Sequence, residues 1–239
     1  IPGIKVDEGT KPLPNCPGEL VTIGLDKLDD RLAKYYEQGA RFAKWRAVID
    51  IGKGIPSHNA VHANAHALAR YAALCQAAQI VPIVEPEVLM DGDHDIDRCY
   101  QVTEWVLKET FQELYYAGVA LEGIVLKPNM AVPGKKSTKK ASVAEVAEKT
   151  VRMLKNCVPG AVPGIAFLSG GQSDEDATAH LDAMNKIGNL PWKLTFSYGR
   201  ALQAAPQKAW SGKSENLAAA QRAFNHRAMM NGLASLGQW

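Results

Sequence analysis

The feature that most constrains the fold is a regular alternation of short β-rich runs with segments of helical periodicity. The β-rich runs recur at intervals of roughly 30 to 42 residues along the chain. They are residues 4–6, 42–49, 80–84, 123–126, 164–168 and 193–196. Because strands that alternate with helices at this period form parallel β-α-β units, the sequence predicts an α/β fold.

The apolar residues between these runs fall at helical spacing and predict the intervening helices. Two helices are expected to end at Gly39 and Gly118, because glycine readily adopts the left-handed conformation that terminates a helix. Two others are expected to begin at Ser142 and Ser173, each of which precedes an acidic residue by three positions, as in a capping box.

The number of strands leaves two architectures open. A closed (β/α)8 TIM barrel needs eight strands, and the pattern shows six. A six-stranded doubly wound sheet is the alternative, but no Gly-x-Gly-x-x-Gly motif follows any of the runs. We therefore expect a single TIM-barrel domain over residues 1–239, with about six of the eight units present and the N-terminal part missing. Since the chain begins at Ile1 without a methionine, we expect the natural protein to be longer.

Composition excludes several classes of function. A net charge of +2 is too small to indicate binding to nucleic acid or to an anionic membrane surface. The four cysteines lie far apart and form neither a disulfide framework nor a zinc motif, so a cytoplasmic location and no metal cofactor are expected. Apolar stretches such as residues 80–84 are too short to cross a bilayer.

Charged side chains cluster at the ends of the predicted strands, where a barrel builds its active site. A single lysine at a strand end is more often a surface residue. A surface position does not explain seven charged residues that converge on one cavity. Burying them is costly unless they pair with one another or with a ligand. Their surplus of positive charge favours a phosphorylated substrate. The residues are Lys5, Lys44, Arg46, Glu85, Glu87, Lys127 and Arg200.

Glycines follow the last two predicted strands. Ser169-Gly170-Gly171 comes after one strand, and Ser197-Tyr198-Gly199-Arg200 comes after the other. Glycine lets backbone N–H groups approach an anion closely, and the late loops of a barrel are its usual phosphate site. Arg200 is expected to add a bidentate clamp.

Five segments together resemble the class I fructose-1,6-bisphosphate aldolases. They are FAKWR at 42–46, IVEPE at 83–87, LKPNM at 126–130, FLSGGQS at 167–173 and LTFSYGRAL at 194–202. The resemblance extends from Ile4 almost to the end of the chain. It implies a lyase of glycolysis and gluconeogenesis that reversibly cleaves fructose 1,6-bisphosphate to dihydroxyacetone phosphate and glyceraldehyde 3-phosphate. It also implies a homotetramer.

The resemblance assigns roles residue by residue. Lys127 matches the Schiff-base lysine, Glu85 the general acid/base of imine formation, and Lys44 a lysine involved in proton transfer. Glu87 matches a residue that hydrogen-bonds within the charged cluster. The remaining matches concern the substrate: Lys5 and Arg46 on the C6-phosphate side, and Ser169, Gly170, Gly171, Ser197, Gly199 and Arg200 around the C1 phosphate.

The chain departs from the family pattern at both ends. The first two barrel strands are absent, together with an aspartate that acts on the C3–C4 bond, and so is the mobile C-terminal tail with its tyrosine. Two alternative functions therefore stay open: a lysine-dependent aldolase of another phosphosugar, and a scaffolding or binding role without catalysis.

Three histidines, His58, His62 and His66, are spaced to share one helix face. This pattern is compatible with metal binding. Because no carboxylate motif lies nearby in the sequence, we interpret the histidines as an exposed polar face.

Overall fold

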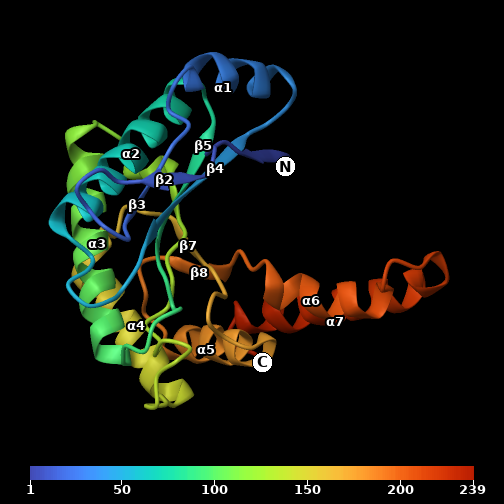
Figure 1. Ribbon diagram of the computed structural model, residues 1–239. Helices are drawn as coiled ribbons and strands as arrows, with labels where there is room; N and C mark the ends of the chain where they lie inside the picture. Colours follow the sequence, from blue (N-terminus) through green and yellow to red (C-terminus); the bar gives the residue numbers. More distant parts are fainter.

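The computed structural model describes residues 1–239, and its centre is an open sheet of six parallel strands (Figure 1). The strand order is β1-β4-β5-β6-β7-β8, so each strand lies beside the next one along the chain, as in a barrel. The strands are β1 (Gly3–Lys5), β4 (Phe42–Ile49), β5 (Val81–Val88), β6 (Val125–Leu126), β7 (Gly164–Phe167) and β8 (Lys193–Phe196). The predicted α/β fold with six strands is confirmed.

Helices connect the strands and follow one another in an arc along one side of the sheet (Figure 1). A helical pair formed by α6 and α7 extends away from this arc, which the sequence analysis did not predict. The helices are α1 (Leu28–Glu37), α2 (His58–Ala77), α3 (Ile96–Tyr116), α4 (Val143–Cys157), α5 (Asp174–Ile187), α6 (Arg200–Trp210) and α7 (Leu217–Ala234), with 3-10 turns at Leu121–Gly123 and Ser214–Asn216. None of these helices is both long enough and apolar enough to cross a membrane.

The predicted helix ends are confirmed. Gly39 and Gly118 follow α1 and α3 with positive φ angles of 99° and 66°. The hydroxyl of Ser142 accepts a hydrogen bond from the amide of Glu145 at the start of α4. Ser173 caps α5 in the same way. These local signals fix where each helix begins or ends.

Strand β5 is longer than predicted. It pairs with β4 along its whole length, from Phe42↔Val81 to Ile49↔Val88, although it contains Pro82 and Pro86. Both prolines occupy the positions whose N–H groups would point toward β6, and β6 pairs with β5 at only two positions. Because few ladder hydrogen bonds are lost on that side, the prolines do not end the strand.

One other local prediction was wrong, and one element was not predicted. The run predicted at 123–126 is a strand only at Val125–Leu126, because Leu121–Gly123 forms a 3-10 turn. A two-stranded antiparallel hairpin, β2 (Thr10–Pro12) with β3 (Leu20–Thr22), was not predicted. Neither difference changes which strands carry the charged residues.

The two faces of the sheet carry different side chains. Trp45 of β4 is fully buried and stacks on Tyr71 of α2, with ring centroids 5.6 Å apart. Since side chains alternate along a strand, the neighbours Lys44 and Arg46 point to the opposite face. The helices therefore cover one face, and the charged cluster lies on the other.

Candidate active site

Glu85 is the centre of the charged cluster. Its side chain is 4% exposed, and its two oxygens face two different lysines. Oε1 lies 3.1 Å from Nζ of Lys127, and Oε2 lies 3.2 Å from Nζ of Lys44. The Lys44 contact is an ion pair without an aligned hydrogen bond, so this buried oxygen retains an unused hydrogen-bonding site. A carboxylate between two amines is well placed to exchange protons with either.

Backbone pairing explains why these three side chains meet. Lys127 follows the last residue of β6, and its amide donates to the carbonyl of Val84 on β5. The register of β4 and β5 sets Arg46 opposite Glu85. Lys44 lies two residues before Arg46 and therefore points to the same face of the sheet. The register of adjacent parallel strands thus brings together residues that are far apart in the sequence. The predicted placement at strand ends holds for Lys127, which follows β6, whereas Lys44 and Glu85 lie within β4 and β5 because both strands continue past them.

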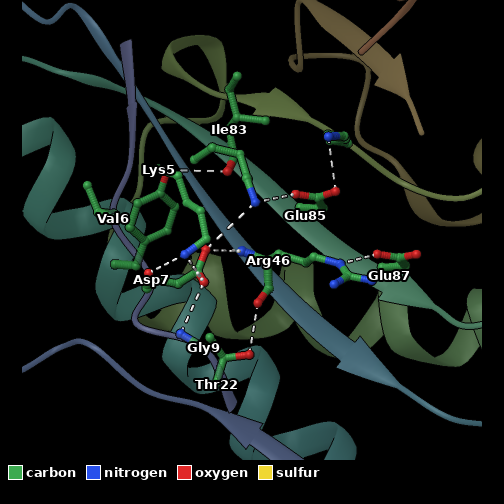
Figure 2. Close-up of polar contacts among 12 residues, drawn as sticks. Lys5, Val6, Asp7, Gly9, Thr22, Arg46, Ile83, Glu85 and Glu87 are labelled. Atoms are coloured by element: carbon green, nitrogen blue, oxygen red, sulfur yellow. Dashed lines mark hydrogen bonds and ion pairs between the residues drawn. The ribbon is translucent and has the colours of Figure 1, made fainter. Parts of the chain in front are cut away.

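A buried aspartate that the sequence analysis did not select belongs to the same cluster. Asp7 lies 2.9 Å from Nζ of Lys5 and 3.7 Å from Nζ of Lys44, and it accepts a hydrogen bond from the amide of Arg46 (Figure 2). Burial alone would raise the pKa of Asp7, but the Lys5 hydrogen bond and the Lys44 charge hold that pKa below its usual value. The strand period from Lys5 was the signal that could have identified Asp7.

Arg46 and Glu87 form a second pair on the same face (Figure 2). The guanidinium Nε of Arg46 donates to Oε2 of Glu87. Burial would lower the pKa of Arg46, but Glu87, Glu85 and Asp7 together raise it, so the guanidinium stays charged. The charged residues predicted to converge from β1, β4, β5 and β6 therefore do so.

The loop after β7 packs closely against its neighbours at two glycines. Gly171 has φ +80°, and a side chain there would place its Cβ 2.6 Å from Cβ of Met90. A Cβ on Gly170 would lie 3.4 Å from Oε1 of Glu87, so this loop is adjacent to the charged cluster. Ser169 is buried. Position 171 requires glycine because both its positive φ angle and the closeness of Met90 exclude other residues.

The loop after β8 lies beside the loop after β7. Phe167 and Phe196 are register partners, and the amide of Ser197 donates to the carbonyl of Phe167 at 2.8 Å. Gly199 and Arg200 follow directly, and Arg200 is the first residue of α6. The side chain of Arg200 is exposed and makes no ion pair, while Glu87 pairs with Arg46 instead. The guanidinium is thus available to an anion.

Asn129 is a second residue that the sequence analysis did not single out. It is 1% exposed, and its Oδ1 accepts from the amide of Val88 at 2.9 Å. Its Nδ2 donates to Thr103 of α3. These bonds fix the segment after Lys127 against the last residue of β5 and an interior residue of α3, which limits the movement of the lysine.

Comparisons with known proteins give one family. The family model described as "Fructose-bisphosphate aldolase class-I" matches residues 1–239. A probable fructose-bisphosphate aldolase class 1 of Xanthomonas campestris is 60% identical over all of this chain and 72% of its own length. The cytosolic fructose-bisphosphate aldolase 4 of Arabidopsis thaliana is 56% identical over 99% of this chain and 61% of its own length.

A solved structure that resembles this chain is also a fructose-bisphosphate aldolase. It is the aldolase of Plasmodium falciparum in complex with TRAP and a small-molecule inhibitor, and it is 49% identical to this chain. The match has a TM-score of 0.98 and covers 100% of this chain and 70% of that one. The six strands therefore correspond to part of an aldolase barrel, which excludes the doubly wound alternative.

Proposed function

This chain belongs to the class I fructose-bisphosphate aldolases, a family of lyases, and we propose that it cleaves its phosphorylated sugar through an imine on Lys127. The observation that supports this assignment is the position of Glu85 between the amines of Lys127 and Lys44. A neutral amine is needed to attack a ketone, whereas free lysine titrates near pH ~10.4 and is mostly protonated at neutral pH. Glu85 lies where it can accept the proton that Lys127 must release.

The proposed reaction passes through an imine and then an enamine, both on Lys127. The Lys127 amine adds to the C2 carbonyl of fructose 1,6-bisphosphate, and loss of water leaves a protonated imine. The C4 hydroxyl loses its proton, and the C3–C4 bond breaks. The electron pair of that bond moves into the imine and gives an enamine. Glyceraldehyde 3-phosphate leaves. Protonation of the enamine at C3 and hydrolysis then release dihydroxyacetone phosphate and restore Lys127.

The two groups of cationic residues fit the two phosphates of this substrate. Arg200 and the backbone of Ser169–Gly171 would hold the C1 phosphate, as glycine-rich loops and arginine forks do. Lys5 and Arg46, from β1 and β4, would hold the C6 phosphate. The substrate would then span the concave face with its C2 carbonyl at Lys127.

The Schiff base can be trapped. The protein is incubated with dihydroxyacetone phosphate, reduced with borohydride, digested, and analysed by mass spectrometry. We expect one reduced adduct, on the peptide that carries Lys127. Protein unfolded by heat before the incubation is the control, because it retains every lysine but not the Glu85 contact. An adduct on a different lysine, or none, would contradict the assignment of Lys127.

Cleavage is expected to survive metal removal. The protonated imine holds the electrons released by C–C cleavage, a role that a divalent metal would otherwise serve. After dialysis against EDTA, kcat should stay within about twofold of its starting value. A loss of cleavage that added zinc restores, with the protein still folded at the assay temperature, would show that the electron sink is a metal.

We also propose a cytoplasmic homotetramer as the working form. Two of the Arabidopsis relatives are named cytosolic, which supports the location. The oligomeric state follows from the family resemblance alone. Light scattering of the purified protein would test it directly.

A further inference from the structure

The three histidines of α2 do not form an isolated polar face. His58, His62 and His66 are stacked along the helix, with successive ring centroids 6.0 and 6.3 Å apart. Two glutamates of α3, Glu109 and Glu113, lie directly opposite them. The carboxylates that the sequence analysis did not find near the histidines are therefore supplied by a different helix, more than 40 residues along the chain.

The contacts between the two helices converge on one point. Nδ1 of His62 lies 2.8 Å from Oε1 of Glu109 and 3.6 Å from Oε1 of Glu113. These three donor atoms lie within 4.8 Å of one another. In a tetrahedral zinc site with bonds of about 2.0–2.2 Å, neighbouring donor atoms are separated by roughly 3.3–3.6 Å. The two printed contacts of Nδ1 of His62, at 2.8 and 3.6 Å, bracket that separation.

Burial of Glu113 gives an independent reason to expect a cation. This residue is 7% exposed, and no lysine or arginine pairs with it. Its two oxygens face only His62 and His66. A buried carboxylate is unfavourable without a positive partner.

We propose that His62, Glu109 and Glu113 form a structural zinc site that joins α2 to α3. Imidazole and carboxylate are ligands that zinc accepts, and the outward side leaves room for water in a fourth position. Zinc accepts the lone pair of Nδ1 of neutral His62, and the single ring proton then resides on Nε2, which faces away from the metal. Nδ1 of His66 donates to Oε2 of Glu113 at 2.8 Å. This hydrogen bond orients the carboxylate so that its other oxygen, Oε1, faces His62.

The site is separate from the catalytic cluster. Helix α2 packs on β4 and β5 through residues such as Tyr71, on the face of the sheet opposite Lys44. The histidine and glutamate side chains lie on the outer helical layer. Zinc at this position therefore stabilises the helices behind the active site without contact with the substrate.

Titration of the chelator-treated full protein with ZnCl2, followed by calorimetry, tests the proposal. We expect one zinc ion per chain with micromolar or tighter affinity. With zinc in about 100-fold excess over Kd, Tm should rise by about 5 °C or more. Cobalt(II) in place of zinc should give the strong visible absorption of a four-coordinate site.

Four variants identify the ligands. His62→Ala and Glu109→Gln should each remove most of the affinity, and His66→Ala should weaken it by about 10-fold or more. His58→Ala is the matched control, because His58 belongs to the same histidine stack but contacts neither glutamate. Absence of stoichiometric binding would overturn the proposal, and so would equal effects of His58→Ala and His62→Ala. Cleavage activity should be unaffected by zinc loading, so this test is independent of the Schiff-base assignment.

Discussion

Replacement of Lys127 by methionine is expected to abolish cleavage, with kcat reduced by about 10⁴-fold or more. Methionine approximates the length of the lysine stem but has no amine, so no imine can form. The side chain of Lys127 is 14% exposed and contacts Glu85 alone among charged groups. Its loss leaves Glu85 paired with Lys44, so we expect Tm to change by only a few degrees.

Steady-state cleavage assays and thermal unfolding of the same preparations separate catalysis from folding. Lys193→Met is the matched control, because Lys193 begins β8 at the end of the strand opposite to the site. This control should retain full activity. If Lys127→Met retained more than about 1% of kcat, another group would have to carry the imine.

Replacement of Arg200 by alanine is expected to lower kcat/KM by about 30- to 1,000-fold, equivalent to roughly 2–4 kcal/mol of charge-assisted binding. Arg200→Lys should restore only part of this loss, because a point charge cannot reproduce the planar two-pronged contact with a phosphate. Both effects should appear with fructose 1,6-bisphosphate and with fructose 1-phosphate, since both carry the C1 phosphate.

Arg46→Ala provides the contrasting measurement. If Arg46 serves the C6 phosphate, its loss should reduce kcat/KM for the bisphosphate much more than for fructose 1-phosphate. Arg46 also pairs with Glu87, so Tm must be measured in parallel. A result in which Arg200→Ala lowers Tm but leaves KM unchanged would show that Arg200 is structural and does not bind phosphate.

The strand pattern and the charged residues associated with the strands were predictable from the sequence because both depend on local spacing. Alternation of β-rich and amphipathic segments predicted six parallel strands in order. In a parallel sheet of this connectivity, residues at matching register positions of successive strands are neighbours when they point to the same face. Lys44, Glu85 and Lys127 therefore met as expected once the strands were aligned.

Some members of the cluster were missed because their partners are distant in the sequence. Asp7 follows a strand of only three residues, and its burial depends on Lys5, Lys44 and the backbone of β4. Asn129 connects β5 to α3 through its amide group. Neither residue carries a local signal as clear as a lysine at the end of an apolar strand.

The sequence by itself determined the fold class, the helix ends at Gly39 and Ser142, and the set of charged residues on and after the strands, since each follows from periodicity or from the backbone preference of one residue. The tertiary structure decided which charges pair. It assigned Glu87 to Arg46, left Arg200 available, and placed Glu109 and Glu113 against the histidines of α2. The register between strands and the packing of α2 on α3 set these pairings, because both depend on contacts between segments far apart in the chain.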